Sequence, residues 1–211
     1  MEKAGLDSLA NALREVADEG ELVEPLAEVL AEACAHTSIS YDTVIFIANE
    51  NAQELMLAAW DLKLLIPRRR GACGEWDYRI PVMRRGEIYE MPNIARYLAK
   101  GAMNSGKWDP GSAVANMYKG AGEKHWKQMP ELIRQLGKQS RDFVISAAAI
   151  DAACRNSGIY HSTGPMILIL KGGGIISPKL ASGIAAAKRR SPLYELNPSL
   201  YPRKKENAES I

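Results

Sequence analysis

The feature that most constrains the fold is a layout that occurs twice along the chain. In each copy a long apolar, helix-like run ends in a short strand, and a turn rich in Arg or Lys leads to a second strand. The first copy occupies residues 51–83 with its turn at Arg68–Gly71, and the second occupies residues 161–198 with its turn at Lys188–Arg190. Helical periodicity that gives way to short β-like runs predicts a helix followed by a β-hairpin. We therefore expect two similar units, related by layout rather than by residue identity.

A chain of 211 residues is long enough for two small domains. We expect a mostly helical α+β protein with small β-hairpins. Residues 1–103 form a first unit, 104–125 a linker rich in helix breakers and compatible with a short helix at 112–119, 126–202 a second unit, and 203–211 a polar tail. The expected helices cover 5–18, 20–36, 41–48, 51–64, 92–103, 130–138, 143–156 and 164–170, and the expected strands lie near 78–83, 87–90, 175–176 and 193–196.

Charge is distributed unevenly along the sequence. The net charge is only +2, but residues 1–60 contain two basic and twelve acidic side chains, whereas the rest contains 25 basic and 13 acidic ones. Such asymmetry is typical of separate faces for separate partners, or of acidic helices that form a solvated outer surface. The basic part is suited to a polyanion.

Several classes of protein are disfavoured. The three cysteines, Cys34, Cys73 and Cys154, are scattered and form no Cys-x-x-Cys pair, so we expect neither a disulfide framework nor a metal. No apolar run is long enough for a membrane span and the first residues lack a leader layout, which favours a cytoplasmic protein. The Lys171–Gly174 run follows a helix rather than a strand, which argues against a phosphate loop. No catalytic constellation or cofactor site is evident, and we do not expect an enzyme.

The second unit carries the most specific pattern. Its three expected helices, a third helix ended by glycines, an Ile-Ile strand and a basic turn resemble the winged-helix domains of DNA regulators. The ending Leu193–Leu200 also resembles the last strand of the winged-helix domain in plasmid replication initiators, where Tyr-x-x-Asn-Pro is common. The resemblance covers about a third of the chain. It implies a duplex-binding helix at 161–171, with Ser162, Thr163 and Lys171 available to phosphates or base edges.

Basic residues beside both hairpins are the candidate contacts. Runs of Arg suit phosphate oxygens because each guanidinium can form paired hydrogen bonds. Arg84 and Arg85 occupy the other turn of the first hairpin, near Trp76 and Tyr78, where aromatic rings could stack on unpaired bases. The expected DNA-binding set is Gln53, Lys63, Arg68, Arg69, Arg70, Arg84, Arg85, Ser162, Thr163, Lys171, Lys179, Lys188, Arg189 and Arg190.

The sequence thus predicts a duplex-DNA-binding protein, either a transcription regulator or a replication initiator. The alternative is a protein-interaction scaffold, since residues 165–170 are almost entirely apolar and offer few groups for base contacts. The N-terminal helices either pack within the first unit or pair with a second copy or another protein. One continuous basic surface would favour DNA, and exposed apolar helix faces would favour a protein partner.

Overall fold

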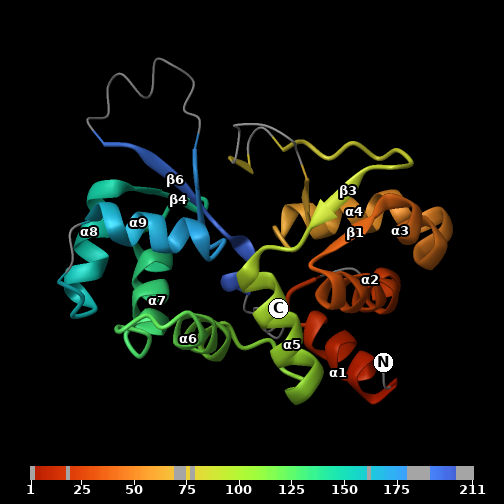
Figure 1. Ribbon diagram of the computed structural model, residues 1–211, viewed down its shortest axis with the longest axis horizontal. Coiled ribbons are helices and arrows are strands. Elements are labelled where there is room, and N and C mark those ends of the chain that lie inside the picture. The colour runs from red at the N-terminus through yellow and green to blue at the C-terminus, as the bar shows by residue number, and fades with distance from the viewer. Residues whose placement is uncertain are drawn as a thin grey trace, which may run out of the picture.

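The computed structural model describes residues 3–17, 20–68, 75–76, 79–160, 163–179 and 191–202. The molecule is mostly helical and contains two small three-stranded antiparallel sheets, one in each half (Figure 1), which confirms the expected α+β class. Within the described residues, no helix combines the length and the apolarity needed to cross a bilayer.

The first half surrounds a sheet with strand order β1-β3-β2. Its N-terminal helices α1 and α2 pack on each other, and α5 closes the half by packing on both. The apolar faces of α1 and α2 are therefore used inside the half, as simple packing predicted. In chain order the elements are α1 (Lys3–Leu13), η1 (Gly20–Leu22), α2 (Val23–His36), β1 (Ser38–Ser40), α3 (Tyr41–Ala48), η2 (Asn49–Asn51), α4 (Ala52–Asp61), β2 (Ile66–Pro67), β3 (Ile88–Glu90) and α5 (Asn93–Ser105).

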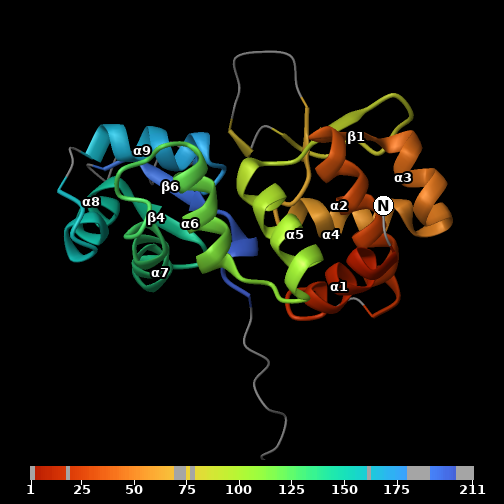
Figure 2. The ribbon, with the colours of Figure 1, turned by 60° about the horizontal axis from the view of Figure 1, so that its bottom comes forward.

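The second half surrounds a sheet with strand order β4-β6-β5. Helix α6 packs between α5 of the first half and α7 of the second (Figure 2). The elements are α6 (Pro110–Gly120), α7 (Met129–Gln139), β4 (Val144–Ser146), α8 (Ala147–Asn156), α9 (Thr163–Gly172), β5 (Ile176–Pro178), β6 (Leu193–Leu196) and η4 (Pro198–Leu200). Buried apolar residues from α1 to η4 form one cluster, so the halves share a core.

The two halves repeat the same order of elements, helix–strand–helix–helix–strand–strand, from α2 to β3 and from α7 to β6. The repetition extends to strand register. The last strand of each sheet places a tyrosine opposite an isoleucine and a proline: Tyr89 opposite Ile39 and Pro67, and Tyr194 opposite Ile145 and Pro178. The twofold layout of the sequence is thus also a repetition of structure.

Equivalent serines begin the second helix of each half. Ser40 ends β1 and accepts a hydrogen bond from Thr43 N at 3.1 Å, and Ser146 ends β4 and accepts one from Ala149 N at 3.2 Å. A serine with extended backbone is a favourable N-cap, because its hydroxyl satisfies an amide that the helix leaves free. The same short motif therefore stops a strand and starts a helix in both halves.

Two predicted elements are wrong in their strand assignment. Residues 79–83 form no strand, although β character was expected at 78–83, because Pro81 lacks the amide that a strand interior requires. The partners of β3 are instead β1 and β2. The helix expected at 143–156 begins only at Ala147, since Val144 and Ile145 pair with β6 and Ser146 caps the helix.

The expected linker at 104–125 contains the eleven-residue helix α6, which is longer than the short helix compatible with residues 112–119. Asp109 caps this helix by accepting a hydrogen bond from Ser112 N at 3.0 Å, and Pro110 occupies its first turn, where no amide donor is needed. Val114 and Met117 are buried in the shared core. Helices α1 and α4 are also shorter than expected, ending at Leu13 and Asp61.

Candidate nucleic-acid interface

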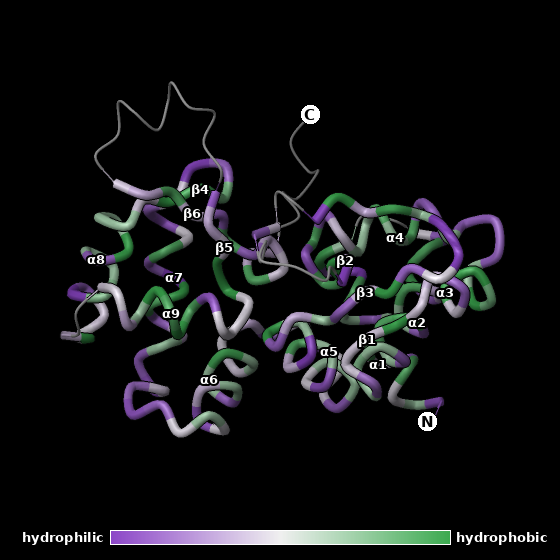
Figure 3. The backbone as a smooth tube through the Cα atoms, turned by 45° about the horizontal axis from the view of Figure 1, so that its top comes forward, coloured by the Kyte–Doolittle hydropathy of each residue, from purple (hydrophilic) through white to green (hydrophobic). Residues whose placement is uncertain are grey.

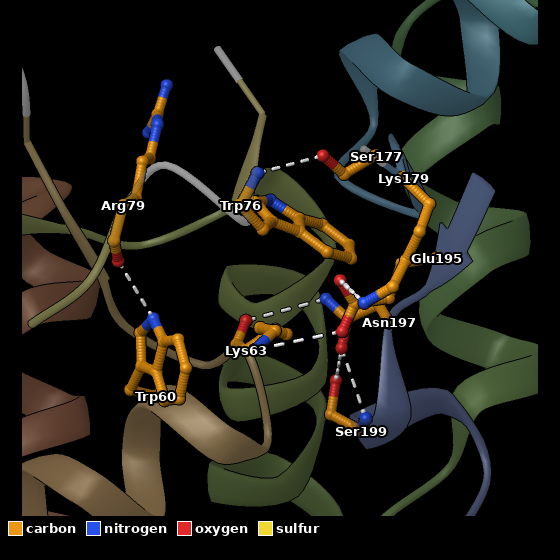
Figure 4. Close-up of polar contacts among 9 residues, drawn as sticks. All are labelled: Trp60, Lys63, Trp76, Arg79, Ser177, Lys179, Glu195, Asn197 and Ser199. Atoms are coloured by element: carbon orange, nitrogen blue, oxygen red, sulfur yellow. Dashed lines mark hydrogen bonds and ion pairs between the residues drawn. The ribbon is translucent and has the colours of Figure 1, made fainter. Parts of the chain in front are cut away.

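The halves meet where the third helix of each one ends. After α4 the chain turns through Lys63 with φ 53°, and after α9 it turns through Gly174 with φ 74°. Asn197 lies between the two turns and is fully buried. Its Nδ2 donates to the Lys63 carbonyl at 3.4 Å (Figure 4) and to the Gly174 carbonyl at 3.0 Å, so one amide joins equivalent points of both halves.

Lys63 was expected to contact DNA, but the structure places its side chain inside the junction. The residue is only 5% exposed. Its ammonium lies 3.9 Å from Glu195 Oε1 and 3.9 Å from the centre of the Trp60 ring (Figure 4). Because the carboxylate comes from β6 of the other half, the lysine charge is paired across the junction and does not belong to a solvent-facing surface.

Lys179 shares the same carboxylate. Its Nζ lies 3.9 Å from Glu195 Oε2, and its side chain is partly buried. It holds the position equivalent to Arg68: each residue directly follows the proline of its strand and donates its amide to the last strand, Arg68 to Ile88 O and Lys179 to Leu193 O. At equivalent backbone positions, Arg68 is exposed, whereas the ammonium of Lys179 faces Glu195 at the junction.

Trp76 docks on the second half instead of facing solvent. The residue is 5% exposed, and its backbone amide donates to Ser177 Oγ at 2.9 Å. Nearby, Trp60 Nε1 donates to the Arg79 carbonyl at 3.0 Å (Figure 4). This bond fixes the backbone of Arg79, three residues after the docked Trp76. Trp76 is therefore not available to stack on bases, contrary to expectation, and Tyr78 lies outside the described residues.

These contacts leave a polar cavity of about 380 Å³ between the halves. Three cationic side chains line it: Arg68 after β2, Arg79 after the docked Trp76, and Lys171 in the last turn of α9. Glu90 supplies one carboxylate and pairs with Arg79. Its rim also contains Thr37, Ser38, Asn93 and Gly172. The arrangement concentrates positive charge from both halves at one place.

The charge of Arg79 is only partly satisfied. One guanidinium nitrogen, Nη1, bonds to Glu90, but Nε is buried and has no hydrogen-bond acceptor. Arg68 and Lys171 are exposed, and neither pairs with a carboxylate of the residues whose positions the structure gives. An orphaned buried donor costs about 1–3 kcal/mol, and a turn of the guanidinium toward an acceptor in the cavity would remove that cost.

Sequence reasoning singled out Arg68 and Lys171, and the structure brings them together at this cavity. It missed Arg79. The available signal was the Trp-Asp-Tyr-Arg order at Trp76–Arg79, where a basic residue follows aromatic ones, as Arg84 does further along. What the sequence could not show is that Trp76 anchors this segment against the other half.

The remaining described candidates lie elsewhere. Arg84 pairs with Glu87 at 2.7 Å and Arg85 lies 3.9 Å from Asp42 at the start of α3, so both exposed arginines face carboxylates of the first half. Thr163 Oγ1 donates to Asp151 Oδ1 at 2.6 Å and holds α9 to α8. Gln53 is exposed on the first turn of α4. Arg69, Arg70, Ser162, Lys188, Arg189 and Arg190 lie outside the described residues.

The exposed faces of the two third helices are poor surfaces for reading bases. Helix α4 exposes Glu54 and Asp61, whose carboxylates would be repelled by phosphates. Helix α9 is mostly hydrophobic (Figure 3), and its Leu168 is 68% exposed. Neither face has the paired donors and acceptors that discriminate base pairs. Base contacts by the expected duplex-binding helix at 161–171, or by α4, therefore gain no support from the exposed side chains.

Comparison with known proteins places the chain in a family. Residues 7–204 match one protein family, so the chain belongs to it, and the match spans both halves together. No curated protein and no solved structure matches the chain.

Proposed function

We propose that the protein is a tandem winged-helix protein that binds duplex DNA through the backbone phosphates. The order helix–strand–helix–helix–strand–strand in each half, with all three strands in one small sheet, supports this class. The proposal includes a cytoplasmic location and a role as a transcription regulator or replication initiator.

The observation that carries the proposal is the meeting of Arg68 and Lys171 at one cavity. They come from different halves and were expected independently as phosphate contacts. Shared burial and the Asn197 bridge hold the halves together, so the two charges keep a fixed separation. A preformed cationic surface made by both units suits a polyanion better than two separate basic patches do.

In the proposed binding mode the protein binds duplex DNA without distinguishing one base sequence from another. Phosphate contacts position a protein on the duplex but do not distinguish base pairs, and the outer faces of α4 and α9 offer little to do so. Binding of this kind releases counterions, so the slope of log K against log salt falls by about 0.9 for each phosphate contacted.

Fluorescence anisotropy with a random duplex of roughly 30 base pairs tests the proposal. We expect the double variant Arg68→Ala, Lys171→Ala to bind at least about ten times more weakly at low salt and to lose roughly two from the magnitude of the salt slope. The control is Lys138→Ala, Arg141→Ala, which removes the same charges from exposed positions that do not line the cavity. If both variants lost the same affinity for the duplex, the loss would come from net charge alone, and the proposal would be contradicted.

A second candidate function, binding a protein partner, is favoured by the apolar surface of the second half. Leu168 on α9 is 68% exposed and Tyr160 before it is 83% exposed. Leu168→Lys separates the two functions. If α9 lies beside DNA, the added charge strengthens duplex binding; if the face binds protein, duplex binding is unchanged or absent in both forms.

A further inference from the structure

We propose that the junction cavity is a binding site for a single phosphate group, held between Arg68, Arg79 and Lys171. This inference deepens the proposed function, and its nucleic-acid branch rests on that function. The phosphate belongs either to the DNA backbone or to a free phosphate-bearing molecule, since both present the same tetrahedral anion to these side chains.

The balance of charge at the cavity fits a phosphate. Three cations and the single carboxylate of Glu90 leave two positive charges in excess among the described lining residues. Because Glu90 already pairs with Arg79, it orients that guanidinium instead of competing for the cations on the rim. Arg68 and Lys171 then face the open cavity with their charges uncompensated by the described residues.

Arg79 lines the cavity and carries one donor that has no partner. Its side chain is 16% exposed, and Glu90 and the Trp60 contact to its carbonyl hold it at both ends. Buried Nε has no acceptor, whereas most buried polar atoms in proteins are paired. One phosphate oxygen could meet the ammonium of Lys171 and another the guanidinium of Arg68, and a turn of the Arg79 guanidinium toward the cavity would bring its Nε–H to the same anion.

The size of the cavity allows more than an inorganic ion. About 380 Å³ lies near the lower end of ligand pockets, which span roughly 300–1,000 Å³. Asn93 and Ser38 on the rim add polar groups that could contact a sugar or another organic group attached to the phosphate. The cavity is formed by both halves, so a bound phosphate would also tie them together.

Thermal unfolding of the full chain in inorganic phosphate tests the site. Chloride replaces phosphate at constant ionic strength in the reference samples. At about ten times its Kd, phosphate should raise the Tm by roughly 3–6 °C, since binding to the folded state alone stabilises it. Arg68→Gln, Lys171→Gln should lose most of this rise, and Lys138→Gln should keep it. Both altered cavity residues are exposed, so this variant is expected to fold.

A charge-preserving variant separates geometry from net charge. Arg79→Lys keeps a cation but removes Nε–H and the planar fork, and it should also lose most of the phosphate-induced rise in Tm. If Arg79→Lys folds poorly because its pairing with Glu90 is altered, the test is the phosphate-induced rise in Tm of Arg68→Gln, Lys171→Gln against that of Lys138→Gln. A phosphate effect no larger than that of chloride, or one of equal size in Arg68→Gln, Lys171→Gln, would overturn the proposal.

Competition with DNA identifies the source of the phosphate. If inorganic phosphate displaces the random duplex from the wild type at constant ionic strength, the site holds a backbone phosphate. If phosphate raises the Tm without displacing the duplex, the site serves a free phosphate-bearing molecule. If phosphate raises the Tm and the duplex does not bind at all, the proposed DNA function fails while the phosphate site stands.

Discussion

Replacing Asn197 with alanine should lower the free energy of unfolding more than removing an exposed hydrogen bond at the junction does. The side chain is fully buried and makes four hydrogen bonds. Nδ2 donates to Gly174 O at 3.0 Å and to Lys63 O at 3.4 Å, and Oδ1 accepts from Ser199 N at 3.1 Å and from Ser199 Oγ at 2.7 Å. Alanine can replace none of these bonds.

The cost follows from the groups that lose their partners. The Gly174 carbonyl and the Ser199 amide lose bonds of normal length, at about 1–2 kcal/mol each for buried groups. The Lys63 bond is long and adds little, and the serine hydroxyl can rotate to another acceptor. We therefore expect a loss of about 2–4 kcal/mol in the free energy of unfolding.

Urea unfolding followed by far-UV circular dichroism measures this loss. For a slope near 3 kcal/mol per molar, the midpoint should fall by roughly 1 M. The matched control is Asn93→Ala: it removes a hydrogen bond of the same kind, from Nδ2 to Gly172 O at 3.2 Å, but Asn93 is exposed, so a change below about 0.5 kcal/mol is expected. Similar losses in both variants would refute the reasoning that burial of the Asn197 bonds determines their value.

Three further predictions concern buried groups. Glu195→Gln removes the carboxylate that faces two junction lysines and should cost about 2–3 kcal/mol in urea unfolding, and a neutral result would show that the pair is not desolvated. Gly137→Ala places a Cβ 2.4 Å from Tyr201 Cε1 and should cost about 1–3 kcal/mol, whereas a gain would mean that the ring moves freely. Burial raises the pKa of Tyr89 to about 12, so stability is complete below pH 10, the usual pKa, and declines as pH rises through about 12; Tyr89→Phe should reduce this decline, and an unchanged pH profile would contradict the assignment.

Helical elements with clear periodicity were predictable from the sequence, and very short strands were not. The helix at 41–48 and the strand at 193–196 have the expected bounds. By contrast, β1 and β4 contain three residues each. Three residues are too few to show alternation, and their hydrogen bonds come from strands far along the chain. Ser40 is both the last residue of β1 and the cap of α3, so the strand ends directly where the helix begins.

The candidate site was predictable only in part because exposure depends on distant residues. Arg68 directly follows strand β2, and Lys171 lies in the last turn of helix α9. Long side chains at such positions reach the surface, and the structure leaves both exposed. Lys63 interrupts an apolar run, which is a sign of a buried pair, but its partner Glu195 comes from the other half. Arg79 joins the site only because Trp76 docks across the junction, a contact without a local signal.

Amide hydrogen exchange of the full chain, with and without the random duplex, shows whether one surface formed by both halves contacts the DNA. We expect slowed exchange at the cavity in both halves at once, around residues 66–68 and 88–93 and around residues 171–179, because both halves contribute cations to the phosphate contacts. Protection confined to one half, or found only on the outer faces of α3 and α4, would contradict it.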